Sequence, residues 1–194
     1  MLDRMGGEVA RATSIVRYAP HSHFSPHTHG GGEEFLVLDG VFQDEHGDYK
    51  AGSYVRNPPS SRHTPGSEPG CTIFVKLWQF DPDDRTVLRT DTATVPFAPA
   101  PDRPGVEVAS LFKDAWEQVR LERWAPNADI ALPVPGGIEV LVLDGSFAES
   151  GEAFTYQSWL RLPAGAVLRA VAGPQGCRVW AKSGHLAREP LAPR

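Results

Sequence analysis

The stretch Glu34-Phe-Leu-Val-Leu-Asp-Gly40 decides the fold, because it occurs again as Glu139-Val-Leu-Val-Leu-Asp-Gly145. Each copy is a short apolar run that ends in Asp-Gly, a pair typical of a tight β-hairpin turn. The following sequence repeats as well, since Ser53-Tyr-Val-Arg-Asn-Pro58 matches Ser158-Trp-Leu-Arg-Leu-Pro163. The second copy follows the first by 105 or 106 residues, so the chain contains two copies of one β-rich unit.

The composition of the chain also favours β-structure. Its 194 residues include 19 glycines and 18 prolines, and 41% of the residues are hydrophobic, which is enough to build a core. Frequent turn residues between short apolar runs are typical of many short strands, whereas only residues 108–119 resemble a helix, and weakly. We therefore expect an all-β fold of the sandwich or barrel type.

A proline-rich stretch separates the two copies. Proline has no backbone N–H to donate to a sheet, so residues 91–104 are expected to form an extended linker. The sequence therefore predicts a first domain at residues 1–90 and a second domain at residues 105–194.

Charge and hydropathy disfavour several classes of protein. The formal net charge of −5 provides no basic stripe, so no nucleic-acid partner is expected. The first residues contain no apolar stretch of signal-peptide length, and no segment approaches a membrane span, so a cytoplasmic protein without a membrane partner is expected. The two cysteines, Cys71 and Cys177, occupy equivalent positions in the two copies, which favours core packing over chemistry.

The histidines point to a metal site. Six of the seven lie in the first copy, where His27 and His29 are two residues apart, so on a strand both imidazoles project from one face. Glu33 follows after three glycines, which allow a tight turn, and His63 lies on a later segment. Imidazole nitrogens and a carboxylate oxygen are ligands expected for zinc, iron, manganese, nickel or copper. We therefore predict one metal site made by these four residues.

The spacing of these residues resembles the motifs of a known family. The first motif of the cupins is similar to His27-x-His29-x3-Glu33-x6-Gly40, a spacing that fits Glu33 rather than its neighbour. The second cupin motif is similar to Gly52-x5-Pro58-x-Ser60-x2-His63, in which the serine stands where that family usually has glycine. Over residues 12–78 the sequence resembles the ChrR-like cupin subgroup, named for the cupin half of a zinc-binding anti-sigma factor.

The resemblance implies a fold and a cofactor. Each copy is expected to form a cupin barrel, that is, a double-stranded β-helix or jelly roll, which makes the chain a bicupin. One divalent transition metal would be held inside the first barrel by three histidines and Glu33, with iron or zinc favoured over manganese, nickel and copper. Because the cupin begins almost at Met1, the helical anti-sigma domain is not expected, and sigma-factor binding is not carried over. A homodimer through sheet edges is a further expectation.

The second copy lacks the whole ligand set. Alignment on the shared Leu-Val-Leu-Asp-Gly places Leu132, Val134 and Ile138 opposite the first three ligands. His63 faces Leu168 or Arg169, depending on a gap of one residue. We therefore predict that the second barrel binds no metal and fills its interior with a packed core.

Four more residues near the motifs are candidates for contacting a substrate. His21 and His23 precede the first motif and could line the barrel mouth or carry protons, although a solvated turn is favoured for both. Tyr54 and Arg56 share one strand face, and the planar guanidinium could orient a substrate oxygen or anion. Arg161 recurs at the equivalent position of the second copy, so a structural role is an equal alternative.

Two classes of function remain open. The first is an oxidoreductase of the dioxygenase type that acts on a small oxygenated organic molecule, because a histidine-rich site can hold a redox metal with positions open to dioxygen and substrate. In such an enzyme Glu33 is the candidate catalytic base if it detaches from the metal, and His21 and His23 are the alternatives. The second is a ChrR-like sensor without catalytic activity, because a four-ligand zinc site is usually closed and structural. The absent anti-sigma domain favours the enzyme.

Overall fold

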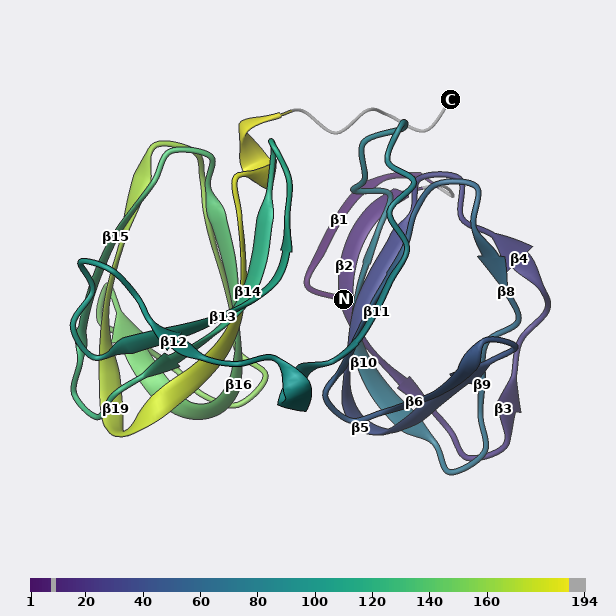
Figure 1. Ribbon diagram of the computed structural model, residues 1–194, viewed down its shortest axis with the longest axis horizontal. Coiled ribbons are helices and arrows are strands. Elements are labelled where there is room, and N and C mark those ends of the chain that lie inside the picture. The colour runs from purple at the N-terminus through teal and green to yellow at the C-terminus, as the bar shows by residue number, and fades with distance from the viewer. Residues whose placement is uncertain (8–9, 189–194) are drawn as a thin grey trace. The chain divides into compact units, whose positions relative to one another are not determined.

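The computed structural model describes residues 1–7 and 10–188 and confirms an all-β fold. The chain divides into two compact units, the first formed by Met1–Thr94 and the second beginning at Val95 (Figure 1). Among the described residues the only helices are two 3-10 turns, Thr92–Thr94 and His185–Ala187. No helix in this part of the chain has the length and apolar character that a membrane crossing requires.

The first unit contains a nine-stranded antiparallel sheet and a separate two-stranded sheet. The main path of the larger sheet runs β1-β2-β10-β5-β7-β11, with β3, β6 and β9 paired beside it, and β4 pairs with β8. The strands of this unit are β1 Asp3–Gly6, β2 Ala10–Tyr18, β3 Ser22–His23, β4 His27–Thr28, β5 Glu33–Asp44, β6 Gly47–Lys50, β7 Ser53–Asn57, β8 Arg62–His63, β9 Gly66–Ser67, β10 Cys71–Leu77 and β11 Leu88–Asp91.

Strand β5 is longer than the sequence pattern suggests. The expected hairpin turn at Asp39-Gly40 is wrong, because the strand continues to Asp44 and turns there into β6. Gly40 instead bends the strand. Its φ is 71°, and a Cβ atom at this position would lie 2.0 Å from the carbonyl oxygen of Gly70, so only glycine fits. Before the bend β5 pairs with β10 and β7, and after the bend it pairs with β6 and β9. The bend therefore lets one strand contribute to both parts of the barrel wall.

The core of the first unit follows from strand alternation. Phe35 and Val37 point into the barrel, whereas Glu34 between them points to the opposite face. Cys71 is buried in the same core, as the sequence predicted, and is a free thiol. The buried core consists of Phe35, Val37, Phe42, Tyr49, Val55, Cys71, Ile73 and Val75.

The second unit repeats this pairing scheme. Its eight-stranded sheet runs β12-β13-β14-β19-β16-β17, with β15 paired to β19 and β18 paired to β16. The register is also repeated, since Phe35 pairs with Val55 in the first unit and Val140 pairs with Leu160 in the second. The strands are β12 Ala98–Pro99, β13 Val106–Lys113, β14 Gln118–Trp124, β15 Asp129–Val134, β16 Ile138–Glu149, β17 Glu152–Phe154, β18 Trp159–Leu162 and β19 Ala166–Ser183.

Two local expectations for the region between the copies differ from the structure. Residues 108–119 are not helical, because Asp114 accepts hydrogen bonds from the backbone N–H groups of Trp116 and Glu117 and so forms a turn between β13 and β14. The proline-rich stretch 91–104 is not wholly a linker. It includes the short strand β12, whose Pro99 is tolerated because β12 lies at the edge of the sheet.

The second unit buries an ion-pair cluster beside its hydrophobic core. The Glu122 carboxylate accepts hydrogen bonds from Arg120 Nε at 2.6 Å, from both terminal nitrogens of Arg103 at 2.9 and 3.0 Å, and from Trp124 Nε1 at 2.7 Å. Burial alone raises the pKa of Glu122, but the two guanidinium groups and these hydrogen bonds lower it below its ordinary value. Glu122 is therefore held as a carboxylate.

We expect Glu122→Gln to lower the free energy of unfolding by about 1–2 kcal/mol at pH 7, because the charged acceptor is lost. A lowered folded-state pKa stabilises the fold above the unfolded-state pKa, and this contribution disappears as the pH falls through the folded-state value. The difference in the free energy of unfolding between wild type and variant should therefore become smaller below about pH 4.5. Urea unfolding across pH checks this, with Glu107→Gln, in an exposed pair with Arg123, as the control. A gap that is constant with pH would contradict it.

Candidate metal centre

Three short segments bring the histidines together. Strand β4 pairs with β8 so that His27 lies directly opposite His63, and His29 follows immediately after β4. Glu33 begins strand β5 and points into the barrel, on the same face as Phe35. The sequence places these residues on separate segments, and the fold unites them.

The three glycines before Glu33 are required by packing. The loop lies against Trp78 and Phe80, and a Cβ atom on Gly31 would lie 2.2 Å from the Trp78 ring. Gly32 has a φ of 77°, and its Cβ atom would lie 2.5 Å from the Phe80 ring. Glycine is therefore the residue that lets the chain pass between His29 and Glu33 in so few residues.

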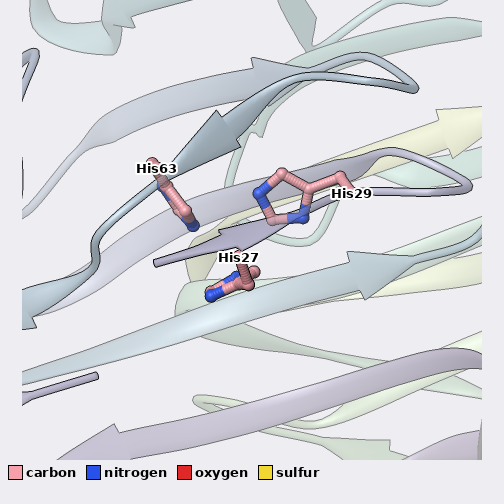
Figure 2. Close-up of side chains that lie close together, drawn as sticks. All are labelled: His27, His29 and His63. Atoms are coloured by element: carbon pink, nitrogen blue, oxygen red, sulfur yellow. The ribbon is translucent and has the colours of Figure 1, made fainter. Parts of the chain in front are cut away.

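The imidazoles of His27, His29 and His63 lie close together and point toward one another (Figure 2). Their candidate ligand nitrogens lie within 4.8 Å of one another, and the ring centroids are 4.7 to 5.0 Å apart. His29 and His63 are buried, whereas His27 is exposed. The cluster is thus accessible from the side of His27.

Glu33 lies beside the three histidines. Its Oε2 atom lies 3.5 Å from His29 Nε2 and 3.6 Å from His63 Nε2. Asn57, opposite Glu33 on β7, donates a hydrogen bond of 3.2 Å to the same oxygen and fixes its direction. Burial raises the pKa of Glu33 above its ordinary value, although the nearby histidines and Asn57 act in the opposite direction.

The buried nitrogens at the centre have no hydrogen-bond partner. Within residues 1–7 and 10–188, the Nε2 atoms of His29 and His63 are both buried and make no hydrogen bond. Burial, together with the neighbouring His63 and His27, lowers the pKa of His29 to about 3. His29 is therefore a neutral imidazole, the form that ligates metals. Buried polar atoms without hydrogen-bond partners destabilise a fold, so these two nitrogens are candidates for binding an ion or another polar group.

Hydrogen bonds behind the cluster set the tautomers. His63 Nδ1 lies 3.2 Å from Asp44 Oδ2, and His27 Nδ1 lies 3.1 Å from the Ser25 carbonyl oxygen. Carboxylate and carbonyl oxygens accept hydrogen bonds, so both Nδ1 atoms act as donors, which in a neutral imidazole leaves the lone pair on Nε2. Burial alone raises the pKa of Asp44, but hydrogen bonds from His63 and from the backbone N–H of His46 lower it below its ordinary value.

Sequence reasoning missed Asp44 and Asn57. Asp44 looks like a surface turn residue, and its side chain is nevertheless only 1% exposed. Its place at the end of β5, two residues after the inward-facing Phe42, is the signal that could have revealed it. Asn57 could have been found as the residue opposite Glu33 once the two strands were paired.

The other candidate substrate contacts do not join this cluster. Tyr54 and Arg56 lie on the face of β7 opposite to that of Asn57, where they are fully buried. There Glu34 accepts a 2.7 Å hydrogen bond from the Tyr54 hydroxyl, and Arg56 contacts Asp84 at 2.7 Å. The structure therefore places Tyr54 and Arg56 outside the histidine cluster, in a buried network with Glu34 and Asp84.

His21 and His23 lie in an exposed turn. Both contact the Glu68 carboxylate, at 2.9 and 3.0 Å, and their side chains are 80% and 70% exposed. This arrangement matches the solvated turn considered for them, and we assign them no part in the cluster.

The second unit has apolar residues at every equivalent position. Leu132 pairs with Leu168 as His27 pairs with His63, which settles the alignment in favour of Leu168 over Arg169. Val134 and Ile138, opposite His29 and Glu33, belong to the hydrophobic core. The expected packed core is present, and an open pocket of about 590 Å³ lies beside Leu132 and Val134.

Comparisons with known proteins agree with this geometry. Residues 1–81 match the family described as the ChrR cupin-like domain. The comparison with curated protein sequences finds no match.

Similar solved structures share the fold of both units. A candidate dioxygenase from Nostoc punctiforme aligns with a TM-score of 0.78 at 17% identity, over 95% of this chain and 74% of that one. Salicylate 1,2-dioxygenase from Pseudaminobacter salicylatoxidans aligns with a TM-score of 0.65 at 12% identity, over 89% of this chain and 70% of that one. Quercetin 2,3-dioxygenase from Acinetobacter baumannii aligns with a TM-score of 0.60 at 14% identity, over 88% of this chain and 67% of that one. The first unit is thus similar to the ChrR cupin-like domain, and the two units together share the fold of these solved structures.

Proposed function

We propose that the first barrel binds one divalent transition metal through His27, His29, Glu33 and His63, and that the chain is a dioxygenase-type oxidoreductase. The observation that carries the metal site is the pair of buried, unpartnered Nε2 atoms that face the Glu33 carboxylate. Three imidazoles and one carboxylate are a donor set that first-row transition metals accept readily.

The spacing of the donors fits a single ion. Two atoms that each lie about 2.1 Å from one metal are separated by about 3–3.5 Å when they are adjacent ligands. The distances from Glu33 to His29 and His63, 3.5 and 3.6 Å, are close to this range. A redox metal bound here would supply open coordination positions and electrons for reaction with dioxygen.

The surrounding residues would orient the substrate and the ligands. Asn57 holds the Glu33 carboxylate, and Asp44 holds His63, so both donors are pre-arranged. The Phe42 ring lies 5.8 Å from the His63 ring, tilted by 33°, and gives the site an apolar wall. Tyr18, 5.7 Å from Phe42, has a raised pKa because of burial and the nearby Glu33, so its hydroxyl remains a neutral donor. Such a site suits a small organic molecule that carries oxygen atoms.

The similar solved structures support a dioxygenase over other redox reactions. Two of them are named as dioxygenases of small aromatic or flavonol compounds. The identities of 12% and 14% are too low to carry the substrate over, so we propose the reaction class and not the substrate.

Oxygen consumption tests this proposal. The chain should be loaded separately with iron, manganese, nickel and copper and mixed with a panel of diketones, flavonols and catechols. We expect substrate-dependent oxygen uptake with at least one metal, and none in a His27→Ala/His63→Ala double variant. Metal-loaded chain that neither consumes oxygen nor changes any compound of the panel would contradict the enzyme.

A second candidate function is favoured by the match to the ChrR cupin-like domain. In this alternative the site holds zinc, which has no redox chemistry, and the chain senses an oxidant or small ligand for a partner protein. Near-stoichiometric zinc, with recovery of one stoichiometric partner that is released under oxidising conditions, would support the sensor. Absence of any stoichiometric partner under both oxidising and reducing conditions would count against it.

A further inference from the structure

The second barrel contains a cavity at the end where the first barrel carries its histidines. The cavity has a volume of about 590 Å³, which is within the range of small-molecule sites, and all of its lining residues belong to the second unit. Leu132 and Val134, the equivalents of His27 and His29, line it. Further apolar wall is supplied by Ala100, Val108 and Trp116.

A buried arginine faces this cavity from strand β14. Arg120 pairs with Ala181 on β19, as Ser14 pairs with Val75 on β10 in the first unit. Because Ala181 and Val75 both lie in their barrel cores, the side chains at these positions point inward. The second barrel therefore has a guanidinium where the first has a small hydroxyl, and Arg120 is only 4% exposed.

The described hydrogen bonds leave part of the guanidinium available. Arg120 donates from Nε to Glu122 at 2.6 Å and from Nη1 to Ser183 at 2.8 Å, and no bond to its Nη2 is found within residues 1–7 and 10–188. Arg103, which also lines the cavity, directs both terminal nitrogens to Glu122. Arg120 is thus positioned by Glu122 and Ser183 and still has donor capacity toward the cavity.

The local charge favours an anion. Two guanidinium groups, Arg103 and Arg120, surround the single carboxylate of Glu122, which leaves one positive charge in excess. Among the other charged residues at the cavity, Glu117 pairs with the buried Lys182 at 2.9 Å, and the rim carries Lys113 beside Asp114.

We propose that this cavity binds a small organic monocarboxylate without a metal, with its carboxylate on Arg120 and its apolar body against Leu132, Val134 and Trp116. The planar fork of arginine matches the geometry of a carboxylate, and the walls match an apolar chain or ring. The site is separate from the histidine cluster and does not depend on the proposed oxidoreductase activity.

Calorimetric titration of the full chain, stripped of metal with a chelator, tests the site. Benzoate and hexanoate are the probes, and benzamide and hexanamide are their neutral counterparts. We expect measurable binding of at least one carboxylate, with its amide at least about tenfold weaker. Arg120→Gln should weaken carboxylate binding by at least about tenfold, whereas Arg123→Gln, at an exposed position of the same strand, should leave it unchanged.

Two further variants keep the test decisive. Ala100→Phe narrows the cavity at a lining residue other than Arg120, so it should weaken binding by at least about tenfold even if Arg120→Gln fails to fold. His63→Ala removes a residue of the proposed metal site in the first barrel and should bind the carboxylates as the wild type does. No binding of either carboxylate, equal binding of the amides, or unchanged binding in Ala100→Phe would overturn the proposal.

Discussion

Replacement of His63 by alanine is expected to lower the affinity of the chain for a divalent transition metal by more than about 100-fold. Loss of a residue that only holds a metal ligand in place typically lowers the metal affinity 10- to 100-fold, and loss of the ligand itself lowers it further. His63 is 2% exposed and has its Nε2 directed at the Glu33 carboxylate, so no water or neighbouring side chain easily replaces it. Competition with a chromogenic chelator, for zinc and for nickel, measures the change.

The control for this experiment is His21→Ala. His21 belongs to the same unit but is exposed and paired with Glu68, so its loss should leave the metal affinity within about twofold of wild type. Equal losses in the two variants would mean that histidines bind the metal without a defined site. An unchanged affinity in His63→Ala would remove His63 from the metal centre.

Asp44→Ala is expected to weaken metal binding by about 10- to 100-fold although Asp44 itself contributes no ligand. The carboxylate accepts the Nδ1–H of His63 at 3.2 Å, and without it the imidazole can adopt the other tautomer or rotate away. Asp44→Asn, which keeps an oxygen acceptor, should lose less metal affinity than Asp44→Ala. The same chelator competition measures both variants.

The matched control is Asp48→Ala, in the same β5–β6 hairpin. Asp48 is exposed and accepts a 2.8 Å hydrogen bond from Gln43, so it shares the hairpin but not the contact with His63. The nitrogen-15 chemical shifts of the His63 ring report its tautomer directly. If Asp44→Ala kept both the tautomer and the affinity, the orienting role of Asp44 would be disproved.

Much of the fold could be predicted because the repeat is encoded locally. The alternation of Phe35 and Val37 with Glu34 identifies a strand with one face in a core, and the same pattern recurs 105 residues later. The bend at Gly40 could not be predicted, because the sequence shows only a turn-forming pair. The close approach of Gly70, which makes glycine necessary, arises from a strand far away in the sequence.

The candidate site was predictable to the extent that it lies in motifs. The short spacing between His27, His29 and Glu33 limits where they can point, and the fold brings His63 opposite His27. Asp44 contacts His63, which lies 19 residues away in the sequence, so this contact could not be predicted from a local motif. The buried cluster around Glu122 was missed because it replaces small or apolar residues of the first copy, so the repeat itself gave no signal for it.

Elemental analysis of the untagged chain, purified anaerobically without chelators, tests the central claim most directly. The account predicts about one equivalent of iron, manganese, nickel or copper per chain, and less than about a tenth of an equivalent in the His27→Ala/His63→Ala double variant. Near-stoichiometric zinc would contradict the dioxygenase and favour the sensor. A metal-free wild-type chain, or metal that persists in the double variant, would contradict the metal centre itself.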